Sequence, residues 1–196
     1  MSLADKSASM LLNCPQKFYL GEEGRVGLDS GGLQRLLDEA ECRTLLMRYG
    51  PAVDWRDRTE LDRLFWPDAD VDLGVFKGLG AETPEFLIQN AGQSLRRWHV
   101  SSSLSLKVDG ESAYAESYAV THAITGDGSA EMASHLFLGR YLDRLEKRGG
   151  EWRIASRRYL LHGQVSDAYV DNPALAQMTK ADDLGPAHPL FSRNRA

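Results

Sequence analysis

The feature that most constrains the fold is a change of sequence pattern near residue 99. Before it, apolar residues recur at helical spacing, whereas after it the chain holds four runs with strand-like alternation. Glycine-containing turns typical of hairpins separate these runs, which cover residues 100–108, 112–124, 131–145 and 151–162. Helices followed by a strand meander predict an α+β fold, with N-terminal helices packed on an antiparallel sheet. Because the last two runs exceed the usual strand length, the sheet is expected to curve into a cone that encloses a pocket.

The first half of the chain is predicted to hold three helices and one short strand. Proline blocks the helical hydrogen-bond ladder, so Gly50-Pro51 should interrupt the first helix. The buried face of that helix should include Leu36 and Leu37. Thr59 forms a capping box that starts the second helix. The expected bounds are Leu33 to Gly50-Pro51, Thr59 to Trp66 and Thr83 to about Trp98, with a strand over 69–73.

A chain of 196 residues suits one domain. Residues 1–32 are predicted to form an N-terminal arm and residues 33–165 the folded domain. Residues 166–196 are predicted to form a tail that closes over the pocket or packs on a partner. With 23 Lys and Arg against 28 Asp and Glu, the net charge of −5 excludes the basic surface of a nucleic-acid or anionic-membrane binder. A small molecule or a protein remains as the partner.

Several common motifs are absent from the sequence. It holds no GxGxxG after a strand, no GxxxxGK[ST], no GxSxG and no HExxH, so neither a nucleotide cofactor nor a serine nucleophile is expected. Cys14 and Cys42 form no CxxC pair, which argues against a zinc knuckle and suits a reducing compartment. The longest apolar run near the start is too short for a membrane span. We therefore expect a cytoplasmic protein that works without cofactor or metal.

The candidate chemistry centres on Asp54, His99 and His122. Local sequence alone favours Asp54 as a helix cap, and a single histidine on a strand is usually structural. Together, however, they offer a base that accepts a proton near neutral pH and a carboxylate that fixes its tautomer. That combination suits proton abstraction without a metal ion.

The chain resembles the SnoaL-like branch of the nuclear transport factor 2-like superfamily, which includes dehydratases, a dehydrochlorinase and polyketide cyclases. The resemblance covers about residues 33–165 and rests on Tyr49…Val53-Asp54-Trp55-Arg56-Asp57, then Leu61-x-x-Leu64-Phe65, an Asp-rich strand, and the closing Gly149-Gly150-Glu151-Trp152 hairpin. It implies a cone-shaped fold and a cofactor-independent lyase acting on a small hydrophobic, hydroxylated, aromatic or alicyclic substrate.

The same resemblance assigns roles residue by residue. Asp54 and His99 match the aspartate and the general-base histidine of the family, and His122 matches a second histidine that assists the leaving group. Tyr49 matches a helix tyrosine of the bile-acid dehydratase. The substrate-polarising tyrosine of scytalone dehydratase has no counterpart here. By residue type, further substrate contacts or the missing acid are expected among Trp55, Arg56, Phe76, Trp98, Tyr118, Arg140 and Tyr159.

Two other interpretations stay open. Histidines on neighbouring strands could bind zinc or iron, although the sequence has no HxH or HxxxE pair. The chain could also be a non-catalytic member of the fold, like the small subunits of ring-hydroxylating dioxygenases.

The convex face of a curved sheet needs a cover. Leu136, Leu138 and Leu142 alternate along one predicted strand and offer an apolar stripe there. We expect a homo-oligomer, a dimer or a trimer, built on that face.

Overall fold

The computed structural model describes residues 30–128, 131–189 and 191. The chain divides into two units, residues 1–34 and residues 35–196. Most of the expected N-terminal arm lies outside the described residues, and residues 30–34 form the first turns of a helix. The packing and the cavities described below belong to the second unit.

Helix α1 spans Ser30–Asp54 and continues through Pro51, so the predicted interruption was wrong. Gly50 has no Cβ to clash with the proline ring, and the Trp55 N–H still donates to the Pro51 carbonyl at 2.9 Å. Burial of Tyr49 and Val53 holds this last part of the helix on the protein. Leu36 and Leu37, which were expected to be buried, are 47% and 49% exposed.

The elements between α1 and β3 differ from the prediction in their bounds. Asp57, rather than Thr59, caps α2, and its Oδ1 accepts the Glu60 N–H at 3.0 Å. Helix α3 ends at Ala91 instead of near Trp98, because Arg96 and Arg97 already pair with β4 as strand residues. The bounds are α2 Arg58–Leu64, β1 Phe65–Asp72, β2 Lys77–Leu79 and α3 Thr83–Ala91.

The four long strands form the predicted antiparallel meander. They are β3 Arg96–Asp109, β4 Ser112–Thr125, β5 Met132–Arg148 and β6 Glu151–Tyr169. The sheet order is β2-β1-β6-β5-β4-β3. Strand β1 pairs parallel with β6, so the sheet is mixed rather than purely antiparallel as predicted. The chain leaves β1 through β2 and α3 and crosses to the far edge, which lets the meander return alongside β1.

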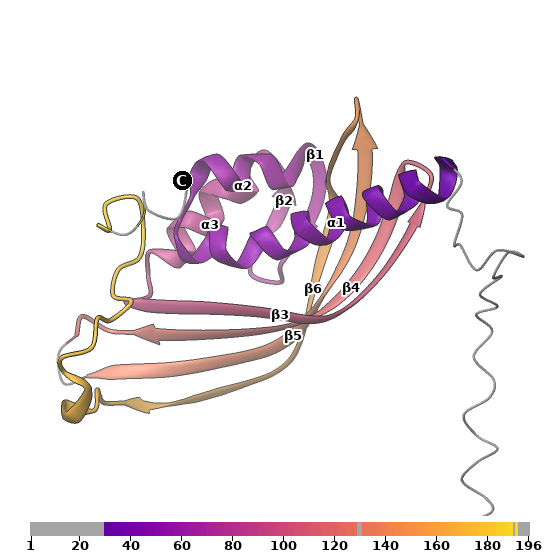
Figure 1. Cartoon of the computed structure of the whole chain (residues 1–196). Coiled ribbons are helices and arrows are strands. Elements are labelled where there is room, and N and C mark those ends of the chain that lie inside the picture. Colours follow the sequence, from indigo (N-terminus) through magenta and orange to yellow (C-terminus); the bar gives the residue numbers. More distant parts are fainter. Residues whose placement is uncertain (1–29, 129–130, 190, 192–196) are drawn as a thin grey trace, which may run out of the picture. The chain divides into compact units, whose positions relative to one another are not determined.

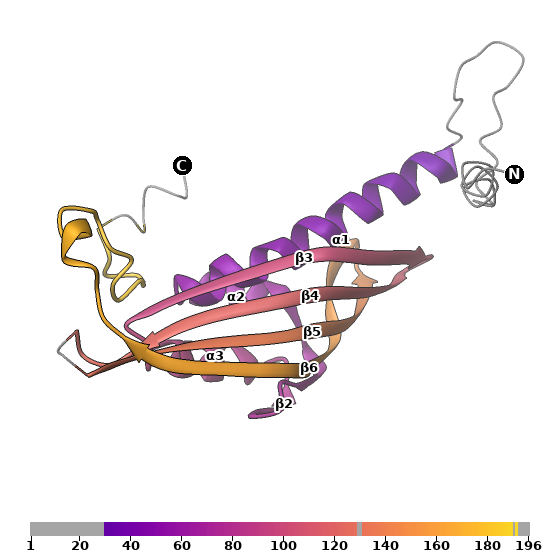
Figure 2. The same cartoon turned by 90° about the horizontal axis from the view of Figure 1, so that it is seen from below.

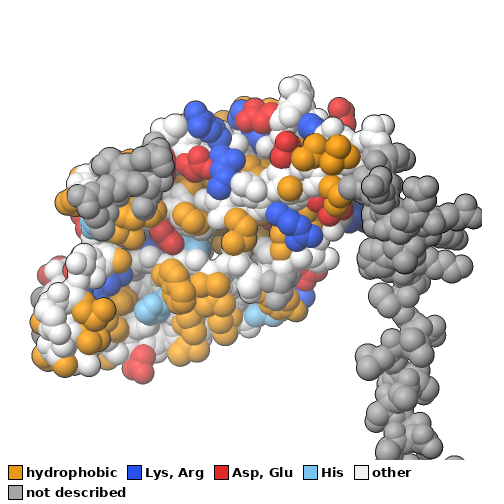
Figure 3. Space-filling view, in the orientation of Figure 1, with side chains coloured by type: hydrophobic (Ala, Val, Ile, Leu, Met, Phe, Trp, Pro, Cys, Tyr) orange, Lys and Arg blue, Asp and Glu red, His pale blue; other side chains and the backbone are white. Residues whose placement is uncertain are grey.

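The sheet curves strongly, and the helices of the second unit lie across its concave side (Figures 1 and 2). Apolar side chains from both layers form one core beneath the helices, while other hydrophobic side chains gather on the surface of the sheet (Figure 3). The buried set includes Cys42, Leu45, Leu46, Val53, Leu61, Leu64, Phe65, Val71, Leu145, Trp152 and Ile154. The fold thus has the predicted α+β architecture of helices on a curved sheet.

The tail begins after β6, which extends beyond residue 165 to Tyr169. Arg96 binds both carboxylate oxygens of Asp171, at 2.7 and 2.9 Å, and also pairs with Asp182. Arg56 donates to the Leu184 carbonyl at 2.7 Å. These contacts hold the described tail against the beginning of β3 and the end of α1.

Candidate active site

A cavity of about 570 Å³ lies between the sheet and the helices of the second unit. Its described lining is mostly apolar and aromatic, and includes no carboxylate. Helices α1 and α3, the β1–β2 connection and strands β3 to β6 all contribute. The apolar and aromatic residues are Tyr49, Val53, Leu73, Val75, Phe86, Leu87, Ala123, Phe137, Tyr141, Tyr159 and Leu161. The polar ones are Asn90, Gln93, Ser94, Arg97, His99, Thr121, Thr125, His135 and Gln164.

Asp54 and His99 meet at the wall of this cavity. Asp54 Oδ1 lies 2.6 Å from His99 Nδ1, and Oδ2 accepts the backbone N–H of His99 at 3.0 Å. The two side chains are only 12% and 9% exposed. Because an ionised carboxylate only accepts hydrogen bonds, this contact favours a proton on Nδ1, and in the neutral imidazole Nε2 then carries the lone pair. Asp54 therefore binds the histidine and does not cap the next helix.

Gly50 allows α1 to approach His99 closely. A Cβ added at Gly50 would lie 3.1 Å from His99 Cβ, which is tighter than an ordinary contact. One turn further along the helix, Asp54 reaches the same histidine. The absence of a side chain at Gly50 thus permits this close packing of the helix against the strand.

A cluster of tyrosines borders the cavity next to His99. The rings of Tyr49 and His99 are 6.2 Å apart edge to face, and Tyr49 and Tyr141 are 5.4 Å apart. Burial raises the pKa of Tyr49, Tyr141 and Tyr159 above the usual value for a phenol. Each hydroxyl therefore stays protonated near neutral pH and can donate a hydrogen bond.

A buried ion pair supports these tyrosines. Arg157 binds both oxygens of Asp143, at 2.7 and 2.9 Å, and its guanidinium lies 4.1 Å from the centre of the Tyr49 ring. Burial works to lower the pKa of Arg157, but the paired Asp143 outweighs it and the pKa lies above the usual value. This fixed pair sets the position of Tyr49 under the cavity.

Several polar residues that line the cavity were not among the sequence candidates, and two of them carry a basic side chain. These two are Arg97 and His135. Arg97 was missed because the predicted third helix included it. In the structure Arg97 and His99 lie two residues apart on one strand, so their side chains share a face. His135 pairs with Ala123 across the strands, and its ring nitrogens bind the hydroxyls of Thr125, at 3.0 Å, and Ser166, at 2.9 Å. With the correct strand bounds, the alternation of side chains between the two faces would have placed both Arg97 and His135 on the face of His99.

His122 does not lie with Asp54 and His99. It is paired with Trp98 and Leu136, while the neighbouring row, His99, Thr121 and Phe137, faces the cavity. Since side chains alternate along a strand, His122 points to the opposite face of the sheet, where Nε2 lies 2.7 Å from the Ser134 hydroxyl.

Three predicted substrate contacts share that outer face. Trp98 is 59% exposed there, and Arg140 stacks over the Tyr118 ring at 4.4 Å while pairing with Glu116 at 2.6 Å. None of the three lines the cavity among its described residues. Because side chains alternate between the two faces along β3, β4 and β5, these three residues lie on the face opposite His99.

Of the remaining candidates, Tyr49 and Tyr159 line the cavity. Phe76 stands behind its wall, stacked 4.6 Å from Phe86, which does line it. Trp55 points away and contacts His188, with ring centres 5.4 Å apart.

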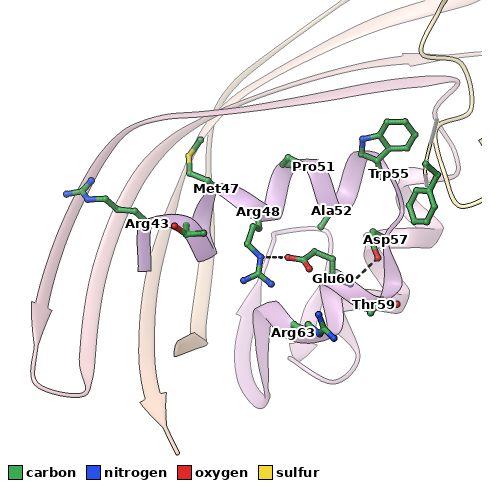
Figure 4. Close-up of a pocket in the computed structure, with 12 residues that line it drawn as sticks. Arg43, Met47, Arg48, Pro51, Ala52, Trp55, Asp57, Thr59, Glu60 and Arg63 are labelled. Atoms are coloured by element: carbon green, nitrogen blue, oxygen red, sulfur yellow. Dashed lines mark hydrogen bonds and ion pairs between the residues drawn. The ribbon is translucent and has the colours of Figure 1, made fainter. Parts of the chain in front are cut away.

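Trp55 belongs to a second hollow, of about 780 Å³, between α1 and α2 (Figure 4). Its carboxylates are already engaged, because Glu60 pairs with Arg48 and Asp57 caps α2. No histidine is among its described lining residues. This hollow is larger but lacks an acid–base pair, so the cavity beside His99 is the candidate active site.

Within the described residues, no cluster of three or more His, Cys, Asp or Glu side chains could hold a metal ion. In the same part of the chain, no helix is both long and apolar enough to cross a bilayer.

The chain matches a known family of domains. The family model for SnoaL-like domains matches residues 34–158. An uncharacterized protein of Mycobacterium tuberculosis is 29% identical over 124 residues, which cover 61% of this chain and 82% of that protein.

Solved structures extend the comparison to the fold. A hexachlorocyclohexane dehydrochlorinase (LinA, type 2) has a TM-score of 0.64 at 21% identity, covering 72% of this chain and 97% of the other. A candidate scytalone dehydratase from Novosphingobium aromaticivorans has a TM-score of 0.57 at 18% identity, covering 70% and 91%. The fold is that of the nuclear transport factor 2-like superfamily.

Proposed function

The chain belongs to the SnoaL-like family, and from that premise we propose that it is a cofactor-independent lyase. It would eliminate a leaving group from a small hydrophobic molecule, with His99 as general base and Asp54 as its partner. The observation behind the proposal is the 2.6 Å contact between Asp54 and His99, because His99 also lines an apolar cavity. The similarity in fold to a dehydrochlorinase supports the same class of reaction.

In the proposed step, His99 Nε2 takes a proton from a carbon of the substrate. The electron pair of the C–H bond forms the new double bond, and the leaving group departs with the electron pair of its own bond. Asp54 keeps Nδ1 protonated and then faces the imidazolium that forms, as the acid does in a Ser-His-Asp triad. A positioned general base of this kind contributes about 10²- to 10⁴-fold in rate.

The lining of the cavity suggests the class of substrate. Its volume lies within the range of small-molecule sites, and its apolar and aromatic walls favour a ring of carbon atoms over a sugar or a phosphate. We infer an aromatic or alicyclic compound that carries a hydroxyl or halide leaving group.

Loss of a hydroxyl group is helped by a hydrogen bond to the departing oxygen, and the buried tyrosines can donate one. Tyr49, Tyr141 and Tyr159 line the cavity, and burial keeps all three protonated. They take the role that the sequence suggested for His122, which lies on the other face of the sheet.

The outer face of the sheet suggests self-association. Trp98, Tyr118, Leu138, Leu142 and Leu160 are each at least 37% exposed and fall on the face opposite the cavity. We propose that a second or third copy of the chain covers them, since monomers rarely expose connected apolar surface of this kind.

An elimination assay tests the proposed function. The full chain is incubated with a panel of neutral one- and two-ring halides and alcohols, and release of halide or formation of the alkene is followed. We expect turnover of at least one compound, with a loss of at least 100-fold in His99→Ala and Asp54→Asn. His122→Ala, which changes a histidine outside the cavity, is the matched control. Absence of turnover on every compound, or full activity of His99→Ala, would favour a non-catalytic member of the fold.

A further inference from the structure

Arg97 brings a fixed positive charge into the cavity beside His99. It lies two residues before His99 on β3 and lines the same cavity. Its Nη2 donates to the Asn90 carbonyl at 2.8 Å and to the Ser94 hydroxyl at 2.9 Å. Because Asn90 is in the last turn of α3, its carbonyl belongs to the partly negative end of that helix. The guanidinium is therefore anchored at one nitrogen by neutral acceptors.

The rest of the guanidinium has no partner in the described part of the chain. Nε is shielded from solvent and makes no hydrogen bond, and no described carboxylate is close enough to form an ion pair with Arg97. Asp54, whose two oxygens accept hydrogen bonds from His99, acts on Arg97 through its charge and forms no hydrogen bond with it. Burial lowers the pKa of Arg97, and the charge of Asp54 partly offsets that effect. A partly buried cation without a paired anion is unusual in a folded protein.

The register of the sheet leaves space next to this cation. Arg97 is opposite Ala123 on β4, and Ala123 is opposite His135 on β5. Adjacent strands are about 4.8 Å apart, so the small side chain of Ala123 leaves a gap between the two larger residues. Both ring nitrogens of His135 already contact hydroxyls, whereas Arg97 retains unused donors.

The net charge of Asp54, His99 and Arg97 changes when His99 takes a proton. With His99 neutral, the Asp54 carboxylate balances Arg97. Once Nε2 has taken a proton, the site carries one positive charge in excess. The same proton transfer creates one negative charge on the substrate, which would be stabilised best beside Arg97.

We propose that Arg97 is the anion-binding residue of the cavity and holds the negative charge that forms as His99 takes the proton. This inference rests on the proposed function and adds a catalytic residue to it. The charge is carried either by a carbonyl oxygen conjugated to the reacting carbon or by the departing group. If the departing group carries the charge, the C–H electron pair forms the new double bond and the group leaves with the electron pair of its own bond. If a carbonyl oxygen carries the charge, the C–H pair forms the C=C bond of an enolate and the C=O π pair moves onto the oxygen; that pair re-forms the C=O bond when the enolate C=C pair shifts to the new double bond and the group leaves. In both cases the proton goes to Nε2 and the anion contacts Arg97.

Binding of 4-nitrophenol tests this inference without turnover, because its absorption spectrum distinguishes the phenol from the phenolate. We expect the wild-type chain to bind the phenolate form roughly 10- to 100-fold more tightly than the uncharged 4-nitroanisole, the range for a charge-assisted hydrogen bond. Arg97→Gln should lose this preference and keep its affinity for 4-nitroanisole. Arg97→Lys, which keeps the charge without the planar guanidinium, should recover part of the preference. Arg140→Gln removes a guanidinium from the outer face and is the matched control; a melting curve verifies that each variant is folded.

The outcomes separate the anion site from the lyase proposal. Equal binding of 4-nitrophenol and 4-nitroanisole, or an unchanged preference in Arg97→Gln, overturns the anion site even if the elimination assay succeeds. A phenolate preference that depends on Arg97 supports the anion site even if no compound is eliminated. Competition by bromide would assign the anion to the departing group, and its absence would assign it to a carbonyl oxygen.

Discussion

The Asp54 carboxylate holds His99 at two points, the ring nitrogen Nδ1 at 2.6 Å and the backbone nitrogen at 3.0 Å. One side chain at the end of α1 therefore fixes both the tautomer of the histidine and the position of its strand. An asparagine of equal size could accept one of these bonds but would carry no charge to face an imidazolium.

We predict that Asp54 and His99 act as one unit. On a compound that the wild-type chain converts, Asp54→Asn and His99→Ala should each lower kcat by about 10²- to 10⁴-fold. The double variant should be little worse than the slower single variant, because removing either residue disables the pair. Independent losses that multiply in the double variant would show that the two residues act separately.

Two other histidines of the sheet, His122 on β4 and His135 on β5, should behave differently. His122→Ala is expected to leave kcat within about threefold of wild type, because His122 lies on the face opposite the cavity. His135→Ala should raise KM or lower kcat, because His135 lines the cavity. Steady-state kinetics of both variants on one compound tests this prediction. A larger loss of kcat/KM in His122→Ala than in His135→Ala would contradict it.

Gly50→Ala is predicted to disturb the site without unfolding the protein. The added methyl group would lie 3.1 Å from His99 Cβ, so His99 must move by a few tenths of an ångström relative to the cavity. We expect kcat to fall while the melting temperature changes little, since alanine favours a helix by about 1 kcal/mol relative to glycine and offsets part of the clash. Unchanged kcat would mean that the close approach has no functional role.

Attachment of the tail should depend on the ionised Asp171. A hydrogen bond from Arg96 holds the pKa of Asp171 below its usual range. A carboxyl group with a lowered folded-state pKa stabilises above its unfolded pKa, about 3.9, and loses that effect as pH falls through the lower folded value. The tail should therefore stay protected at pH 5, whereas Asp171→Asn should loosen it even at pH 7. Hydrogen exchange at the Asp183 amide, which donates to the Leu95 carbonyl, measures this. Equal protection in both proteins would refute it.

The sheet face offers a test of assembly. Leu142 is 37% exposed on the face away from the cavity. Replacing it with glutamate should lower the mass measured by light scattering, because a charge would enter the proposed contact between copies. Leu36→Glu, on the exposed side of α1, is the control and should not change the mass. A monomeric wild-type protein at micromolar concentration would contradict the proposal.

Pattern alone was enough to predict the order of the helices and long strands and the pairing of the last four strands, but the short strand β2 was not predicted. Hairpin signals are local, so Asp109-Gly110 and Gly149-Gly150 marked two turns correctly. Local rules failed where tertiary contacts decide. Pro51 stays helical because Gly50 removes the clash and burial holds the turn, and Arg97 is a strand residue because it pairs with β4.

The site was harder to predict for the same reason. Resemblance brought Asp54 and His99 together as candidates, and the structure places them in contact. It gave no information about which face each strand residue occupies, so His122, Trp98 and Tyr118 were grouped with residues that face the other way. Moving a strand residue by one position turns its side chain to the opposite face of the sheet, and amino-acid composition does not reveal which face a residue occupies.

If His99 removes a proton from a molecule bound in the cavity, the reacting carbon of that molecule must lie next to its side chain. The most direct measurement is a crystal structure of His99→Gln, which keeps the size of the side chain, soaked with a compound that the wild-type chain converts. We predict that the reacting carbon lies about 3 to 3.5 Å from the glutamine side chain, within the cavity bordered by Tyr49 and Arg97. A compound bound in the hollow between α1 and α2, or with its reacting carbon turned away from position 99, would contradict the account.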